Sequence, residues 1–530
     1  MTKARPKSST TEQHARKIAT AIAKGRLPAP TSDLDRYLED CPGEIFAAFD
    51  GAARHMPPAG KDDALAFGYL FLMQALLERL RYRAERGYAD AAELIAKFQA
   101  EVAAQADAER IDGNMLAFVG SALHQARIPA GPELAEVSAR RHVSDESGPI
   151  PADIRAVLED LIEACGGDPF GLVGSLAEFG HAMPEEARSA LVAGLALAGQ
   201  PDARAAAVLF LQDSSPAVRR AAAGALVQVA SSLSPVDLRR LIAVRNWRPQ
   251  NERAEVDAVV RKARTAGIEC ARWEAGGVET ILATAIDGAA AQAFLLVSPA
   301  GRKKRISSIL TKGGIADAWV GDPESRRSIE AAMAAAGMDA PMLAVSRSYL
   351  DRMLSHALAL TAERDEAPPL GLLQVAETMG GADWQSARMD FSATLSELIA
   401  GLPKAMRDSA AVPAVLRKSG ELDGLAAFEQ SWFEDDPEMA RIVASGGTRG
   451  RAKLVTYLLQ SVIARRRDKW ADLFLHTALW MREAPPDADL CWRELAIVAD
   501  AIARGCDLTE IGLMHNIAQR TIAALAGVTT

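Results

Sequence analysis

The sequence has few aromatic residues and few cysteines, and each shortage argues against a class of structure. Aromatic side chains make up 5% of the 530 residues, so the chain has little of the bulk that β-strands favour. The five cysteines lie far apart and form no CxxC pair, which argues against a disulfide framework and a structural zinc site. We therefore expect reduced thiols in a cytoplasm and no bound metal.

The chain also lacks a long hydrophobic run and an excess of positive charge. Its longest apolar stretch, Ala64 to Met73, is much shorter than the roughly 20 residues that a membrane-spanning helix needs. The residues before Gln13 are polar and resemble neither a signal peptide nor an anchor. The net charge of −9 argues against a protein whose main task is to grip nucleic-acid phosphates. We predict a cytoplasmic protein that does not enter membranes.

Catalytic signatures are missing as well. The sequence contains no HExxH, GxSxG or GxxxxGK[ST] motif and no GxGxxG after a strand. None of its eight histidines lies three to five residues from another, so His356 and His476 are interpreted as packed or surface residues. We predict no cofactor and favour a protein that is not an enzyme. A site assembled from distant residues would leave no such motif, so an enzyme stays an alternative.

The apolar residues that are present favour helices. The chain is 49% hydrophobic and 24% charged, and alanine, the best helix former, dominates the apolar set. We predict a mainly α protein with an N-terminal helical region (1–147), helical repeats (148–277), a small β insertion (278–320) and a C-terminal helical region (321–530). The polar stretch from Arg140 to Pro151 is the best linker candidate in the first half.

The clearest architectural pattern lies within residues 184–267. Ser215-Pro216 and Ser234-Pro235 each place an N-cap serine before a proline at the first helical position. Between them, apolar side chains recur on one helical face at Val218, Ala222, Ala225, Leu226 and Val229. Short amphipathic helices with short connections must bury their faces against neighbouring helices. This pattern predicts stacked helix pairs.

The segment from Asp213 to Leu226 resembles the second-helix motif of HEAT-repeat proteins, an armadillo-like superfamily. In that family an aspartate precedes the helix, and a valine-arginine pair and small residues pack the repeat. The matching positions here are Asp213, Val218, Arg219, Ala222 and Leu226. The resemblance implies a binding scaffold without naming its ligand.

Beyond residue 277 the helical rhythm breaks. Val278–Ala285, Gln292–Val297 and Lys304–Leu310 are short apolar runs separated by the turn signals Asp287-Gly288 and 298–301. They predict a small antiparallel sheet near 278–310 inside the helical array. Short apolar runs also occur as buried helices, so that alternative stays open.

Three groups of cations are candidate binding residues. The first, Arg302-Lys303-Lys304-Arg305, falls at the predicted hairpin turn, where charge also prevents edge pairing. The second combines cations with a tryptophan: Arg465, Arg466, Arg467, Lys469 and Trp470. Arginine beside tryptophan is able to grip phosphate and stack on a base, but we favour a helix junction with Trp470 packed in the core.

The third group lies in the repeat region: Arg219, Arg220, Trp247 and Arg248. Some HEAT-like proteins handle DNA with a concave basic face, including a group of alkylbase DNA glycosylases. Nearby acids such as Asp213 and Glu252 offset this charge locally. We therefore predict a non-enzymatic scaffold that binds another protein along a helical-repeat surface. A nucleic-acid-binding protein and an enzyme remain the alternatives.

Overall fold

The chain forms two compact units, Met1–Leu191 and Val192–Thr530, and the boundary falls inside one helix. The computed structural model describes residues 10–22, 32–56, 64–143, 162–163, 165–180, 185–273, 277–339, 341–381, 384–422, 431–435, 437–445, 450–485, 488 and 490–526. Most of the predicted linker Arg140–Pro151 lies outside these residues. All five cysteines are described, and all are free thiols, as predicted.

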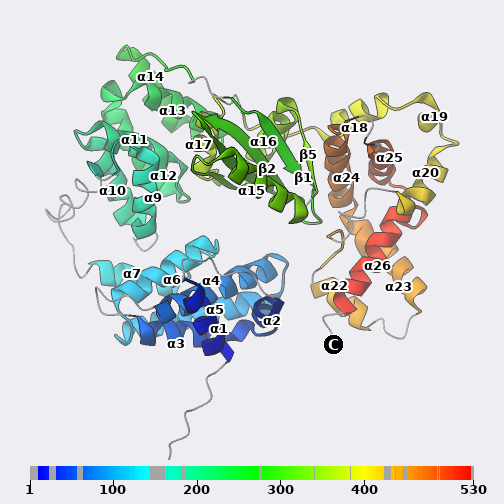
Figure 1. Ribbon diagram of the computed structural model, residues 1–530, viewed down its shortest axis with the longest axis horizontal. Helices are drawn as coiled ribbons and strands as arrows, with labels where there is room; N and C mark the ends of the chain where they lie inside the picture. Colours follow the sequence, from blue (N-terminus) through cyan, green and yellow to red (C-terminus); the bar gives the residue numbers. More distant parts are fainter. Residues whose placement is uncertain are drawn as a thin grey trace, which may run out of the picture. The chain divides into compact units, whose positions relative to one another are not determined.

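The first unit is helical, and α1 to α7 form the bundle drawn in blue to cyan in Figure 1. Its elements are α1 (Thr10–Ile22), α2 (Ser32–Asp40), η1 (Pro42–Glu44), α3 (Ile45–His55), α4 (Ala64–Glu85), α5 (Ala89–Asp107), α6 (Gly113–Gln125), α7 (Pro132–Val143) and α9 (Pro169–Gly180). The long α4 is the centre of the bundle, because α1, α3, α5 and α6 all pack against it. Its core includes Phe49, Leu76 and Phe98, which are fully buried.

The apolar stretch Ala64–Met73 begins α4, and one of its faces is exposed. Leu72 and Met73 are buried, but Phe67 and Phe71 are 42% and 36% exposed. These two phenylalanines are four residues apart and so share one helical face. The near-continuous apolarity concealed this exposed face, because periodicity is invisible where every position is apolar. Among the described residues, no helix is long and apolar enough to cross a membrane.

The second unit begins within α10 (Glu185–Leu197) and continues as short helices. These are α11 (Pro201–Leu209), η2 (Phe210–Gln212), α12 (Pro216–Gln228), η3 (Ala230–Ser232), α13 (Pro235–Trp247) and α14 (Arg253–Thr265). Both predicted N-caps are confirmed. The Ser215 side chain accepts the N–H groups of Ala217 and Val218. Ser234 and Asp237 form a capping box at the start of α13.

These helices pack in pairs that lie side by side. α11 contacts α12 within the first pair, and α13 contacts α14 within the second. Between the pairs, α11 contacts α13 and α12 contacts α14. Small residues fill the interior between these helices: Ala206, Val218, Ala222 and Val259 are fully buried. Small side chains allow such close approach of helix axes.

A five-stranded sheet follows, with the order β4-β3-β2-β1-β5 and antiparallel pairing throughout. Its strands are β1 (Thr280–Thr284), β2 (Ala291–Ala300), β3 (Lys303–Lys312), β4 (Ile315–Val320) and β5 (Met342–Ala344). The prediction of a mainly helical chain with a small antiparallel sheet is confirmed. We did not predict β4 as a strand of its own, or β5, whose three residues follow a helix and are too short to show a period.

Three helices of the same unit pack against the sheet: α15 (Arg326–Asp339), α16 (Arg347–Glu363) and α17 (Gly371–Thr378). α17 lies so close to β4 that a Cβ on Gly371 would be 1.8 Å from the Ala318 carbonyl oxygen. Trp480, from the C-terminal helices, donates a 3.0 Å hydrogen bond to the Ala283 carbonyl in β1. The sheet therefore connects the repeat helices to the C-terminal part.

The C-terminal part is again helical (Figure 1). Its elements are α18 (Phe391–Ala400), α19 (Lys404–Arg407), α20 (Val412–Lys418), η4 (Ser419–Glu421), α22 (Pro437–Ser445), α23 (Arg451–Tyr457), η5 (Leu458–Val462), η6 (Ile463–Arg466), α24 (Arg467–Arg482), α25 (Trp492–Ala503), η8 (Leu508–Glu510) and α26 (Gly512–Ala526). The buried α24 and α25 form the main contact, and α20 packs against both α25 and α26.

Candidate functional site

The arginines of the repeat region are used inside the fold. Arg219 lies 2.5 Å from Glu252, and Arg248 contacts the other oxygen of that carboxylate at 2.5 Å. Arg219 also donates to the carbonyls of Asp213 and Asp365, at 2.9 and 3.2 Å. Arg219 and Arg248 are 2% and 1% exposed. Their guanidinium groups therefore stabilise the junction between the repeat helices and the segment before α17.

The charged groups of this cluster shift each other's pKa values. Burial lowers the pKa of Arg248 to about 10, although the Glu252 carboxylate partly opposes that shift. For Glu252, burial by itself would raise the pKa, but the hydrogen bond from Arg219 and the two positive charges lower it overall. The carboxylate therefore stays ionised, because two buried cations depend on it.

The remaining repeat candidates lie in different environments. Trp247 is fully buried, with its ring 6.1 Å from that of Trp384, so it belongs to the core. Arg220 is exposed on α12. On α13, Arg239 and Arg240 both bind the carboxylate of Glu377 in α17, at 3.0 and 2.8 Å. The candidate residues of this region therefore do not form one basic face.

The basic run 302–305 lies at the turn between β2 and β3, as predicted. Arg302 and Lys303 are exposed, whereas Lys304 is half-buried and pairs with Glu279. Arg305 is half-buried and opposite Ser298 in the sheet. The turn itself uses Gly301 at a φ of +63°, a conformation that favours glycine.

The run Arg465–Trp470 surrounds a buried carboxylate. Glu434 is 2% exposed; it binds Arg466 at 2.8 Å and Lys469 at 2.9 Å, and it accepts the indole N–H of Trp470 at 2.8 Å. Trp470 is fully buried. These contacts agree with the helix-junction interpretation of the run.

The other two cations of that run also have partners. Arg465 forms an ion pair with Glu438. Arg467 donates to the backbone carbonyl of Ile502, 3.3 Å away. The sheet turn, the Glu434 cluster and the Glu252 cluster are thus three separate sets of contacts.

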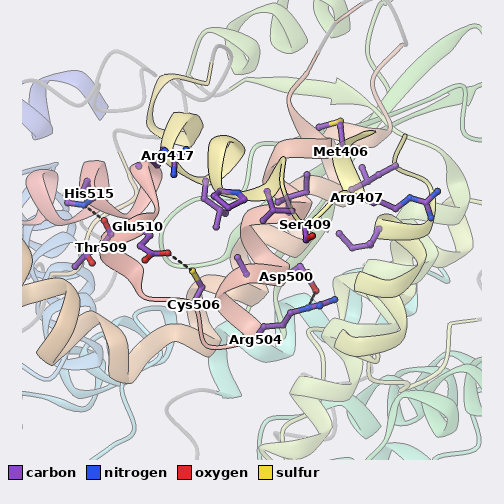
Figure 2. Close-up of a pocket in the computed structure, with 18 residues that line it drawn as sticks. Met406, Arg407, Ser409, Arg417, Asp500, Arg504, Cys506, Thr509, Glu510 and His515 are labelled. Carbon is purple, nitrogen blue, oxygen red and sulfur yellow. Dashed lines mark hydrogen bonds and ion pairs between the residues drawn. The ribbon is translucent and has the colours of Figure 1, made fainter. Parts of the chain in front are cut away.

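The C-terminal helices enclose a cleft that sequence reasoning missed. It has a volume of about 1000 Å³, and Figure 2 shows its lining. One wall comes from the end of α18, α19 and α20, and the other from α25, η8 and α26. The floor is apolar: Leu402, Leu416, Ile497 and Ala501 are buried there. Ile399, Met406 and Val412 are half-buried on its sides.

Close backbone packing closes one end of the cleft. A Cβ on Gly512, the first residue of α26, would be 2.5 Å from the Arg417 carbonyl oxygen. The Ser419 hydroxyl accepts the Leu513 N–H at 2.9 Å, and Asn516 donates to the Gly420 carbonyl at 2.8 Å. These contacts join α26 to the end of α20 and so hold the two walls together.

Five charged residues line the cleft, and they are unevenly partnered. Arg504 binds Asp500 at 2.9 Å, and Glu510 accepts a weak hydrogen bond from the Cys506 thiol at 3.7 Å. Arg407 and Arg417 are exposed, and neither guanidinium group has a hydrogen bond or ion pair to any residue that the structure describes. The wall formed by α19 and α20 is therefore the positive side of the cleft.

The described lining of the cleft includes a thiol, Cys506, and an imidazole, His515. Burial and the Glu510 carboxylate raise the pKa of Cys506, so its thiol stays protonated and unreactive. His515 contacts the carbonyl of Thr509 at 2.8 Å, which directs the imidazole toward the backbone. The described lining is suited to holding an apolar surface with a charged edge.

Two histidines that are distant in sequence do meet in the fold. His356 on α16 and His476 on α24 have ring centroids 5.2 Å apart. The Nδ1 atom of His356 accepts the Met389 N–H at 3.1 Å, so this ring is neutral. Within the described residues, no group of three or more potential ligands is able to hold a metal ion. The pair is therefore interpreted as packing.

Sequence signals for the cleft were present but weak. α19 (KAMR) and α20 (VPAVLRK) carry four cations and no acidic residue. We did not single out this segment, because such short helices show little periodicity and its apolar partners come from a region about 90 residues later.

Comparison with known proteins gives two regional matches. Residues 184–267 match a family model described as the Y4lR second domain, and residues 392–526 match the Y4lR C-terminal helical domain. The chain is 28% identical over 382 residues to the uncharacterised protein y4lR of Sinorhizobium fredii (strain NBRC 101917 / NGR234), an alignment that covers 71% of this chain and 72% of the relative. No solved structure matches. The chain is thus similar to y4lR both in the repeat helices and in the domain that contains the cleft.

Proposed function

We propose that this protein is a non-enzymatic scaffold that binds another protein, and that the C-terminal cleft holds a segment of that partner. The observation that carries the proposal is the cleft itself: about 1000 Å³ with a buried apolar floor and exposed cations on one wall. Grooves of this kind between helices receive the apolar face of a partner's helix. The unreactive Cys506 and the backbone-directed His515 favour binding over catalysis.

The repeat helices support the same proposal as a rigid platform. The contacts of α11 with α13 and of α12 with α14 are those expected of HEAT-like stacking, in which equivalent helices of successive pairs lie together. α13 is covered by α16 and α17, so the surface left for a partner is carried by α12 and α14. Arg220 and Arg261 are exposed there.

The nucleic-acid alternative receives less support. A phosphate-binding face needs several adjacent cations that are free to release counterions. The Glu252, Glu377 and Glu434 clusters instead hold five arginines within the fold: Arg219, Arg248, Arg239, Arg240 and Arg466. Arg302 and Lys303 are exposed at the sheet turn, which makes too small a patch for strong backbone binding.

The test begins with recovery of partners by the tagged full-length chain, with nuclease present, followed by direct binding measurements with each purified partner. Val412→Asp places a charge on the side of the cleft, and we expect it to weaken binding at least tenfold. Ala414→Asp is the matched control, because Ala414 is exposed on the same helix and does not line the cleft.

A partner that binds Val412→Asp as tightly as the wild-type chain would contradict the cleft as the docking site. In that case Arg220→Glu combined with Arg261→Glu tests the outer face of α12 and α14. Unchanged binding by both variants would contradict the scaffold proposal as stated.

A further inference from the structure

The two walls of the cleft differ in charge. On the α19–α20 side, Arg407 and Arg417 have no partner among the described residues. Figure 2 shows them at separate places along that wall, Arg417 above the Cys506 end and Arg407 beyond Met406. Lys404 and Lys418 belong to the same two helices and are also exposed. Cations at four positions with no acid on either helix create a consistent positive field.

The α25–α26 side is different because its arginine already has a partner. Asp500 is paired with Arg504 at 2.9 Å, and Glu510 has only a weak contact with the neutral Cys506 thiol. A ligand cation reaches Asp500 only by displacing Arg504, so Glu510 is the carboxylate left for it on this side. A ligand with carboxylates on the opposite side meets arginines that lose no existing partner. The cost of desolvating an existing ion pair therefore favours one orientation of charge.

The volume of the cleft indicates the size of the occupant. An α-helix about 10 Å wide rises 5.4 Å per turn and so fills roughly 420 Å³ per turn. A cleft of about 1000 Å³ thus accommodates about two turns of helix. Two turns present apolar side chains to the floor at i, i+3, i+4 and i+7 and leave one flank for charge.

We infer that the occupant of the cleft is an acidic amphipathic helix of the partner protein, with its carboxylates directed at Arg407 and Arg417. This inference rests on the proposed function and adds the chemistry of the bound segment. Arginine binds carboxylates through two parallel N–H donors, so Arg407 and Arg417 set the register of the bound helix. The apolar floor supplies most of the affinity.

The experiment selects helices on the full-length chain. A display library of peptides about 16 residues long, roughly 24 Å as a helix, keeps apolar residues at helical spacing and lets the flanking positions vary among Glu, Lys and Gln. Selected peptides are then measured by fluorescence anisotropy against the wild-type chain, Val412→Asp, and the double variant Arg407→Glu/Arg417→Glu. Arg451→Glu/Lys453→Glu is the control, because both residues are exposed on α23 and the variant has the same net charge.

We expect selected peptides to be rich in Glu on one flank and to lose binding in Val412→Asp. The double variant Arg407→Glu/Arg417→Glu should weaken them about tenfold or more and should prefer Lys-rich peptides when the selection is repeated. The Arg451→Glu/Lys453→Glu control should change affinity less than threefold.

Two results separate this inference from the proposed function. Peptides that depend on Val412 but are neutral or Lys-rich, and that are insensitive to Arg407→Glu/Arg417→Glu, would overturn the acidic helix and leave the docking cleft in place. Failure to obtain any peptide sensitive to Val412→Asp, with the variant folded as judged by circular dichroism, would overturn both.

Discussion

The arginines of the repeat helices and those of the C-terminal cleft differ in burial and in ion pairing. Arg219 and Arg248 are almost fully buried and share the carboxylate of Glu252. Arg407 and Arg417 are exposed and have no counter-charge among the described residues. Both sets looked alike in the sequence as cations on short helices.

The difference follows from the free energy of burying charge. A guanidinium removed from water must find a carboxylate or carbonyl oxygens, so a buried arginine already has its partner within the fold. An exposed arginine keeps its hydration and has no such requirement. A buried cation is therefore evidence about stability, and an exposed unpaired cation beside an apolar cleft is evidence about binding.

The largest effect is expected where the buried pairing is broken. Glu252→Gln removes the negative charge that Arg219 and Arg248 share, and we expect a loss of about 3–5 kcal/mol in the free energy of unfolding. Urea unfolding of the full chain, followed by circular dichroism, measures it. Glu269→Gln is the control because Glu269 is exposed. A loss below about 1 kcal/mol would mean that the cluster is solvated. It would then contradict the interpretation of Arg219 and Arg248 as buried cations that need the Glu252 carboxylate.

The His356–His476 pair extends the comparison to half-buried basic groups. Burial, then the neighbouring His356 and Arg352, lower the pKa of His476 to about 3, below its ordinary value of 6.5. The unfolded chain therefore binds a proton that the folded chain rejects. The resulting stability is fully present above pH 6.5 and is lost as the pH falls toward 3.

We expect the unfolding free energy to fall by on the order of 2 kcal/mol between pH 6.5 and pH 4 through this site. This is less than the full effect of binding one proton only in the unfolded state, because the half-buried ring is partly screened by solvent. Unfolding curves of wild-type and His476→Gln chains across this range measure it. The variant should show a shallower slope. Parallel slopes would indicate that other groups cause the acid sensitivity.

A smaller effect is expected at Glu434, whose cationic partners are only partly buried. Arg466 and Lys469 keep 28% and 43% of their side chains exposed, so both recover hydration when the carboxylate is neutralised. Glu434→Gln should cost about 1–2 kcal/mol, and Glu438→Gln, at the more exposed end of the cluster, less than about 1 kcal/mol. The reverse order in thermal unfolding would contradict the relation between burial and cost.

The smallest effect on stability is expected in the cleft. Arg407→Ala combined with Arg417→Ala removes two exposed side chains without described partners, and we expect a change within about 0.5 kcal/mol. Differential scanning calorimetry tests this. A larger loss would show that these arginines support the fold, and it would remove the contrast on which the binding proposal depends.

Much of the local structure was predictable because it depends on neighbouring residues. The serine-proline pairs at Ser215 and Ser234 marked helix starts, since an N-cap hydroxyl acts within three residues. The hairpin around Gly301 was predictable from turn chemistry and apolar runs on either side. β5 and the exposed face of α4 were missed, the first for its length and the second because its apolar pattern has no polar interruption.

The helical class, the small antiparallel sheet and the starts of several helices were predictable from the sequence, because these follow from contacts a few residues apart. The packing of the folded chain, by contrast, buries Arg219 against Glu252, brings His356 to His476 and places α20 and α25 around a cleft. Such contacts join residues that are tens to more than a hundred positions apart. They depend on how whole elements pack, and no local sequence pattern indicates which distant side chain will pair with a buried charge.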